Sequence, residues 1–397
     1  MNKKKVLVGV TASFDSLATV LLLKLQNYEV NAIHVVIDPI EKDNGANDRD
    51  SIYCLKKNNK KLLDEILSSL SVPLYYVDMK ESFKELVLNN AVLASFMKEF
   101  HAPCLYCNKI KILALYEKLF KLNADYIATG HYAKIRKLGK EDYVSLYQHS
   151  EEHLDQHKFL AGLDQTVLSK LILPLGDLTR EKVTSVIQEH LPQFFHHLSL
   201  GENHGFCTVM KDFSQSIRNH IPPSMNKKNR LFLRESKTYL NEAYDNTEFE
   251  FGKVLKIGKN PKGKDQLLVV TGFNYSYQTV YVNHQQNCDT HYLFVQVVEF
   301  FGRPKSYGPI ISQISINDES QLFDAEIYFK GLNYALISLK NKKHHYVPSK
   351  SLVFIFTETT VGRKLMYLAR VVNQGQLEGE FSNVNFRLAK LEGDYPF

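Results

Sequence analysis

Two cysteines that stand three positions apart are the first candidates for chemistry. Cys104 and Cys107 lie in the segment Pro103-Cys104-Leu105-Tyr106-Cys107-Asn108. Five cysteines in 397 residues are too few for a disulfide framework, so the spacing indicates redox or metal chemistry in a reducing compartment, with a local structural role as the alternative. With Cys207 they could ligate an iron–sulfur cluster that keeps one open iron, a less favoured reading, whereas zinc would need a fourth ligand.

A loop near the N-terminus could bind phosphate. It reads Gly9-Val10-Thr11-Ala12-Ser13-Phe14-Asp15-Ser16 and lies between a predicted strand and a predicted helix. Backbone N–H groups at the start of a helix can hold phosphate oxygens, Asp15 could hold Mg²⁺ beside them, and Ser16 could cap the helix. The alternative is that Thr, Ser and Asp only cap the helix here, as they commonly do.

Alternating strand-like and helix-like segments must position these residues. The first half predicts strands at 6–10, 30–37, 74–77 and 126–128, and helices at 16–26, 52–70, from 83 onward, and at 109–122 after a cysteine loop. This order predicts an α/β fold in which a parallel sheet carries crossover helices. Ligands bind such sheets at the carboxyl ends of the strands, where Thr129-Gly130-His131-Tyr132 is also expected.

The pattern changes after about residue 205. A hairpin is expected from strands at 251–257 and 266–271, around a basic turn at 259–264. Short β-branched and aromatic runs then recur between turns, which predicts a small C-terminal β-barrel or sandwich. These runs lie at 293–301, 310–316, 325–329, 335–339, 352–357 and 365–372.

Composition excludes a disordered chain, because 44% of the residues are hydrophobic and 12% are aromatic. No apolar stretch approaches the ~20 residues of a membrane span, and the apolar run after Lys5 is too short for a signal peptide. We therefore expect a cytoplasmic protein with no membrane partner. A net charge of +6 permits a polyanionic partner, and the basic segments at 56–61, 226–230 and 259–264 are candidate phosphate contacts.

Ordered segments along the chain resemble one enzyme family. The N-terminal loop resembles the Ser-Gly-Gly-x-Asp-Ser signature of the N-type ATP pyrophosphatases, kept as Thr11-Ala12-Ser13-Phe14-Asp15-Ser16. The others are similar to the tRNA-specific 2-thiouridylases, and the resemblance is strongest over residues 1–213. They are Pro103-Cys104-Leu105-Tyr106-Cys107-Asn108-Lys109-Ile110-Lys111, the stretch 124–133 around Thr129-Gly130-His131-Tyr132, Asp155-Gln156-His157-Lys158-Phe159-Leu160, Pro174-Leu175-Gly176 and Gly205-Phe206-Cys207.

The resemblance implies ATP-dependent thiolation of the wobble uridine at C2, in the anticodon region of tRNA. ATP adenylates the base with release of pyrophosphate, and sulfur then replaces the activated oxygen. Cys207 matches the position that takes sulfur as a persulfide from a sulfur-carrier or donor protein. Cys107 matches the position that releases this sulfur, leaving a Cys107–Cys207 disulfide, and Cys104 stands where many members carry an acidic residue that assists the uridine chemistry.

The resemblance also implies the binding residues and the domain order. Asp155 and Gln156 match a tRNA-contacting segment. The implied domains are an N-type ATP pyrophosphatase-like catalytic domain at 1–207, a small central tRNA-contacting domain at 208–285 and a C-terminal β-barrel at 286–397. The expected ATP-binding residues are Gly9, Thr11, Ala12, Ser13, Asp15, Ser16, Val35 and Gly130.

The phosphate loop departs from the family signature. Ala12 and Ser13 replace both glycines, which costs about 1–3 kcal/mol at any position that requires a positive φ. The alternative function is therefore a non-catalytic paralogue that binds tRNA or a sulfur carrier without activating ATP. Retention of Asp15, Gly130 and both family cysteines favours the enzyme, so the chain is identified as a divergent member or paralogue.

Overall fold

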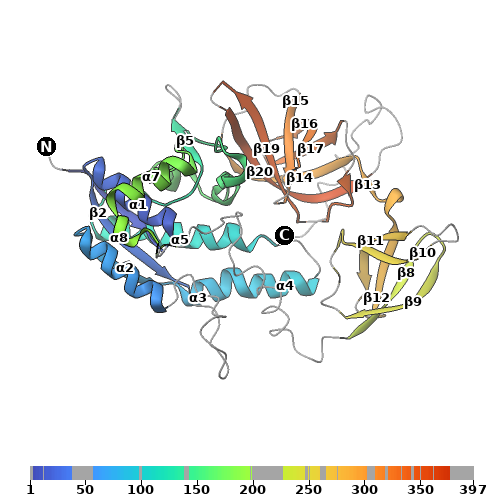
Figure 1. The fold of residues 1–397 in the computed structure, drawn as a ribbon. Coiled ribbons are helices and arrows are strands. Elements are labelled where there is room, and N and C mark those ends of the chain that lie inside the picture. The colour runs from blue at the N-terminus through green and yellow to red at the C-terminus, as the bar shows by residue number, and fades with distance from the viewer. Residues whose placement is uncertain are drawn as a thin grey trace.

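The computed structural model describes most of the chain in three successive regions (Figure 1). Ala12, Cys207 and the segments at 38–56 and 199–226 lie outside the described residues. The described residues are 3–11, 13–37, 57–97, 101–137, 143–196, 198, 227–245, 249, 251–259, 265–274, 276–301, 309–317, 321–331, 333–340, 344–348, 350–360 and 362–375.

The N-terminal region is built on a parallel sheet with the strand order β3-β2-β1-β4-β7. Apolar side chains of β1 are buried on both faces, because helices cover each side. The predicted α/β fold is thereby confirmed. The strands are β1 (Lys5–Gly9), β2 (Glu29–Val36), β3 (Leu74–Asp78), β4 (Tyr126–Ala128) and β7 (Leu171–Ile172).

Two hydrophobic cores lie on the two faces of this sheet. Val6 and Val8 pack with α1 (Phe14–Leu25), α2 (Lys57–Ser69) and α7 (Arg180–His190). Leu7 packs on the opposite face with α5 (Pro103–Lys121). The remaining helical segments are α3 (Lys80–Phe83), the π-helical turn η2 (Lys84–Asn89), α4 (Asn90–Met97), η3 (Glu152–Leu154), η4 (His157–Leu160), α6 (Gln165–Leu168) and α8 (Pro192–Phe195).

One expectation about the cysteines is wrong. They were expected in a loop before a helix at 109–122, but α5 already begins at Pro103, so both lie within its first two turns. Proline is favourable at the first helical position, where its missing N–H would have had no partner. The cysteines are therefore held on a helix of 19 residues.

The C-terminal region is a closed β-barrel with the strand order β14-β17-β16-β15-β19-β20, closed by pairing of β14 with β20. The six predicted strands are confirmed, and closure decides for a barrel against a sandwich. They are β14 (Tyr292–Phe300), β15 (Ile310–Ile316), β16 (Phe323–Lys330), β17 (Tyr334–Leu339), β19 (Leu352–Thr359) and β20 (Gly362–Gly375).

The N-terminal region contributes a hairpin to the sheet of the barrel. Its strands are β5 (Lys134–Lys137) and β6 (Val144–Tyr147), and β6 pairs with β20 at Tyr147 and Lys364. The two regions also share a core, in which Phe301 and Phe354 of the barrel pack with Leu146 and Leu105. The domain boundaries at 207 and 285 remain predictions. The hairpin places part of the expected first domain in the same sheet as the expected last domain.

The central region is a separate sheet with the order β10-β11-β12-β8-β9 and its own core. The predicted hairpin is present as the antiparallel pair β10–β11. The strands are β8 (Lys228–Leu233), β9 (Thr238–Asp245), β10 (Val254–Lys259), β11 (Asp265–Asn274) and β12 (Thr279–His284), followed by η6 (Gln285–Asn287) and the short pair β13 (Asp289–Thr290) and β18 (His344–His345). None of the helices among the described residues is long and apolar enough to cross a membrane.

Candidate functional site

The loop after β1 is closed by its own hydroxyl groups. Ser13 is the N-cap of α1, with φ −84° and ψ 149°, and its side chain accepts a hydrogen bond from the Ser16 amide at 3.3 Å. This φ is ordinary for an L-residue, so Ser13 carries no strain in place of glycine. The Thr11 amide donates to Ser16 Oγ at 3.1 Å, and the Thr11 hydroxyl donates to Ser13 Oγ at 3.0 Å. The Ser16 amide, which was expected to hold phosphate, is thus bonded to a hydroxyl oxygen.

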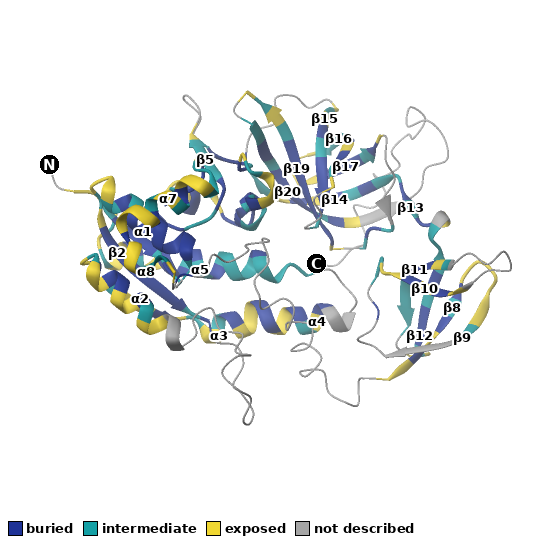
Figure 2. Cartoon of the chain, in the orientation of Figure 1, coloured by how far each residue is buried: buried dark blue, intermediate teal, exposed yellow. Residues whose placement is uncertain are grey.

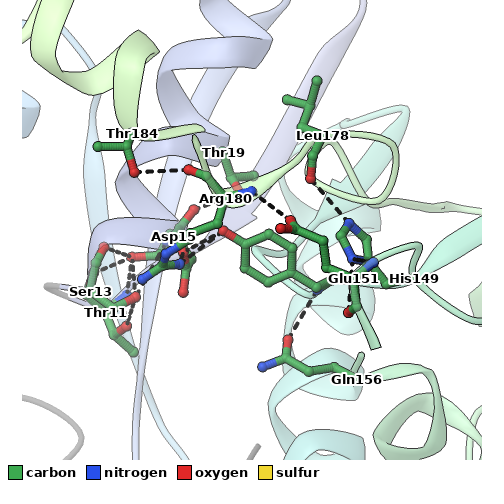
Figure 3. Close-up of polar contacts among 12 residues, drawn as sticks. Thr11, Ser13, Asp15, Thr19, His149, Glu151, Gln156, Leu178, Arg180 and Thr184 are labelled. Atoms are coloured by element: carbon green, nitrogen blue, oxygen red, sulfur yellow. Dashed lines mark hydrogen bonds and ion pairs between the residues drawn. The ribbon is translucent and has the colours of Figure 1, made fainter. Parts of the chain in front are cut away.

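Asp15, in the first turn of α1, lies in a buried ion pair (Figure 3). Its Oδ1 accepts hydrogen bonds from the Tyr132 hydroxyl at 2.9 Å and from Arg180 Nη1. Arg180 Nη1 also donates to the Tyr132 hydroxyl at 2.9 Å, and its guanidinium lies 5.1 Å from the ring centroid of Phe14. The side chains of Asp15 and Arg180 are only 7% and 22% exposed. A protein cation therefore neutralises this carboxylate.

This pairing bears on the expected Mg²⁺. A magnesium ligand must turn an accessible oxygen toward the metal, and Mg²⁺ gives up its waters reluctantly. Asp15 Oδ1 instead accepts from two protein donors inside a buried network. Asp15 in this arrangement does not fit the metal, and no chemical step is assigned to Mg²⁺ here.

The phenol of Tyr132 is held in its protonated form. Burial, followed by the negative charge of Asp15, raises the pKa of Tyr132 despite the opposing effect of Arg180. The backbone N–H of Arg180 donates to Glu151 Oε2 at 2.7 Å, which fixes the first turn of α7. The network thus ties the loop after β1 to the start of α7.

Gly130 follows β4 and lies against the start of α1. A Cβ at this position would stand 2.8 Å from the carbonyl oxygen of Asp15 and 3.1 Å from the Ser16 nitrogen. The close backbone approach therefore requires glycine, whatever the residue does for a nucleotide. Gly9 at the end of β1 is likewise close to Leu115 of α5, and Val35 is buried near the end of β2.

His131 stays neutral at the same edge of the sheet. Its Nδ1 lies 2.8 Å from the Thr129 hydroxyl. Burial, and after it the positive charge of Lys111, lower the pKa of His131 to about 4. Lys111 therefore places a positive charge near the turn that follows β4.

Cys104 and Cys107 are half-buried at the N-terminal end of α5. The three described cysteines, these two and Cys288, are not joined by a disulfide. The expected Cys107–Cys207 disulfide and the iron–sulfur cluster both involve Cys207, which lies outside the described residues. Among the residues that are described, no group of three or more metal-binding side chains is present.

The barrel contacts the cysteine helix beside these thiols. Tyr106 stacks on His101 with ring centroids 5.1 Å apart, and its hydroxyl accepts a hydrogen bond from Arg370 Nη2 of β20 at 3.2 Å. Burial lowers the pKa of His101 to about 4, with a smaller contribution from Arg370, although the Val87 carbonyl opposes it. The candidate thiols therefore lie where the N-terminal region meets the barrel.

Asp155 and Gln156 direct their side chains into the protein. Asp155 Oδ1 accepts from the His149 amide at 3.0 Å, and its Oδ2 pairs with His157 Nδ1. Gln156 Oε1 accepts from the Tyr132 amide at 3.0 Å. Gln156 holds the segment after β6 against Tyr132 (Figure 3), whereas Asp155 joins residues of that segment to one another. The contact of both residues with RNA remains a prediction.

Arg180, Tyr132 and Arg370 are the site residues that sequence analysis missed. Arg180 lies 165 positions from Asp15 along the chain, so no local spacing joins them. Tyr132 was noted only as part of the turn after β4. The barrel arginine had no sequence signal at all.

Comparison with known proteins places these contacts in a family. A family model described as tRNA methyl transferase HUP domain matches residues 4–211, which cover the parallel sheet, the hydroxyl-closed loop and the cysteine helix. The chain belongs to this family. The resemblance of this chain to the tRNA-specific 2-thiouridylases is confirmed by relatives that carry that name.

Two of these relatives show how far the similarity extends. The tRNA-specific 2-thiouridylase MnmA 1 of Clostridium tetani is 34% identical over 193 residues, covering 47% of this chain and 50% of its own. The tRNA-specific 2-thiouridylase MnmA of Nitrosomonas europaea is 28% identical over 290 residues, covering 71% of this chain and 75% of its own. The chain thus spans about half the length of the first of these relatives. A solved NMN synthetase from Francisella tularensis has a TM-score of 0.30 and 11% identity, covering 56% of this chain and 80% of that chain.

Proposed function

We propose that this HUP-domain protein is a tRNA-uridine 2-sulfurtransferase that thiolates the wobble uridine at C2. The observation that carries the proposal is the course of α5, which packs on one face of the sheet and whose N-terminal end lies at the carboxyl ends of β1 and β4. Leu115 approaches Gly9, and Lys111 acts on His131 after β4. Cys107 is four residues before Lys111, about 6 Å along the helix, and therefore lies beyond the sheet edge near the expected nucleotide.

The chemistry has two stages. The C2 oxygen of uridine attacks the α-phosphorus of ATP and pyrophosphate leaves, which turns a poor leaving group into AMP. The terminal sulfur of a Cys207 persulfide then attacks C2 and expels AMP. The Cys107 thiolate attacks the Sγ of Cys207, which releases 2-thiouridine and leaves a Cys107–Cys207 disulfide for an external reductant. A sulfur-carrier protein reloads Cys207 after that reduction.

The proposed chemistry requires an RNA substrate whose target base is already partly unstacked. The target base must leave its stack to reach a cysteine, and bases of an anticodon loop do so at lower cost than bases in a helix. Mass spectrometry of tRNA nucleosides from cells that lack the protein is the test. We expect 2-thiouridine at the wobble position to disappear and to return with the wild-type gene. An unchanged level in a strain with no second copy would reject the proposal.

The hydroxyl-closed loop favours a second candidate function, in which the protein is a paralogue that binds tRNA or a sulfur carrier without activating ATP. Ser13 Oγ accepts from the Ser16 amide, where a phosphate oxygen would otherwise be received. ATP binding must break that hydrogen bond, whose net contribution is about 0.5–1.5 kcal/mol.

We therefore expect Ser13→Gly to strengthen ATP binding by about 3- to 10-fold, measured by calorimetry with and without tRNA. Glycine is also an adequate N-cap, so α1 loses only a few tenths of a kcal/mol. Ser13→Ala is the matched control, because it removes the hydroxyl but keeps the Cβ; equal gains in both variants identify the hydroxyl as the competitor. No heat with ATP for any of the three proteins would favour the paralogue.

A further inference from the structure

The outer face of the central sheet carries arginine and aromatic side chains in alternation. Along β8, Asn229, Leu231 and Leu233 are buried, and the two leucines enter the core of this region. Successive side chains of a strand point to opposite faces, so Arg230, Phe232 and Arg234 share the other face. Both arginines are exposed and Phe232 is half-buried. Figure 2 shows the buried and exposed stretches of the strands in this region.

These side chains form one continuous row across three neighbouring strands. Phe232 lies between Tyr239 of β9 and Tyr281 of β12, with ring centroids 5.0 Å and 5.8 Å away, and both contacts are edge-to-face with interplanar angles of 71° and 86°. The guanidinium of Arg230 lies over the Tyr239 ring, 4.3 Å from its centroid, and that of Arg234 lies over the Tyr281 ring, 4.7 Å from its centroid. The order is therefore Arg230, Tyr239, Phe232, Tyr281, Arg234, which we call the stacked face after the guanidiniums that lie over the two tyrosine rings.

Neighbouring residues hold this stack in place. The Tyr239 hydroxyl lies 3.5 Å from Thr279 Oγ1 on β12. Gly272 of β11 faces Tyr281, and a Cβ there would stand 2.9 Å from Arg234 Nη2, so glycine leaves the room that the guanidinium occupies. The arginines are thus positioned by the sheet itself.

The charge of the stacked face is positive. Arg230 and Arg234 carry it, and exposed Lys228 has the same side-chain parity on β8. The carboxylate of Glu235, which follows Arg234, accepts hydrogen bonds from the His284 amide at 3.1 Å and from Asn287 Nδ2 at 2.9 Å. No carboxylate of a described residue forms part of the stack. Tyr239 remains 48% exposed, so its ring adds little to the core.

We infer that the stacked face binds unpaired nucleotides of the tRNA, with bases stacking on its aromatic rings and phosphates paired with its arginines. Every base has a π-face, so aromatic stacking accepts any sequence, and arginine adds cation–π attraction and phosphate contacts. The positive charge that Lys228, Arg230 and Arg234 give this face matches a polyanion such as RNA. The choice of tRNA rests on the proposed function, whereas the preference for single-stranded RNA rests on the stacked face alone.

Fluorescence anisotropy tests this with two probes, a labelled single-stranded oligouridine 12-mer and an unmodified tRNA transcript. We expect Phe232→Leu and Tyr239→Leu each to weaken binding of the 12-mer by about 5-fold or more, because base stacking contributes that much per aromatic residue. The slope of log affinity against log salt should stay unchanged, since no charge is removed. Arg230→Lys keeps the charge and should also lose affinity.

Tyr277→Leu is the matched control. This tyrosine is 72% exposed in the turn before β12 and has no place in the stack, so its removal should leave affinity unchanged. Wild-type affinity in Tyr239→Leu and Arg230→Lys, both at exposed positions, would overturn the inference even if Phe232→Leu misfolds. Binding of the 12-mer without any 2-thiouridine formation would reject the proposed enzyme and leave the stacked face standing.

Discussion

Replacing Cys107 or Cys207 with serine is expected to reduce 2-thiouridine formation by at least about 100-fold, because in the proposed mechanism each variant removes a group that acts directly on sulfur. ATP-dependent adenylation of the tRNA should persist in both, since neither thiol acts in that stage. The readout is the 2-thiouridine content of tRNA after incubation with ATP and a persulfide source, beside the release of pyrophosphate.

Cys288→Ser is the matched control for these variants. Burial, with help from Glu235 and Asp289, raises the pKa of Cys288 to about 11, so this thiol stays protonated and unreactive. We expect it to thiolate tRNA as the wild type does. A Cys207→Ser protein with full activity would exclude the persulfide step. Complete loss of 2-thiouridine formation in Cys104→Ser, with full activity in the other cysteine variants, would instead assign the chemistry to Cys104.

The second large effect concerns the buried ion pair between Asp15 and Arg180. Asp15→Asn and Arg180→Met are each expected to lower the free energy of unfolding by about 2–4 kcal/mol, because each leaves one charge buried without its counter-ion. The range is set below that of a fully buried pair because the Arg180 side chain is 22% exposed. Urea unfolding followed by circular dichroism measures the change.

The variant that carries both Asp15→Asn and Arg180→Met measures how much of the stability comes from the interaction between the two side chains. With both charges removed, the loss should be smaller than the sum of the two single losses, and the difference measures their coupling. Arg136→Met is the comparison, because Arg136 pairs with Asp177 at a more exposed site and should cost less than about 1 kcal/mol. Additive single losses would show that Asp15 and Arg180 act separately.

The fold was predictable where a strand has a continuous run of apolar, β-branched or aromatic residues. The run Val6–Val10 predicted β1, which is displaced by one residue. The β-branched and aromatic runs between turns predicted the six barrel strands β14, β15, β16, β17, β19 and β20. The hairpin β5–β6 was not predicted. Lys134-Ile135-Arg136-Lys137 is short and mostly charged, and the strand that continues its sheet lies more than 200 residues away.

The candidate site was predictable in its residues but only partly in its contacts. Gly130 and the loop after β1 meet at the expected edge of the sheet. Sequence reasoning gave Asp15 a metal because it could not show which cation folding would bring there. The start of α5 is not evident from the sequence, because proline is common in loops but is also favourable in the first turn of a helix, where Pro103 lies.

The hairpin that β5 and β6 add to the barrel shows that the segment matched by the family model is not a folding unit by itself. The family match ends at residue 211, yet Leu105 and Leu146 within it are covered by Phe301 and Phe354 from far outside. A fragment cut at that point would expose these apolar side chains and leave β6 without its neighbour β20. The segment that the family model matches therefore depends on the barrel for part of its own interior.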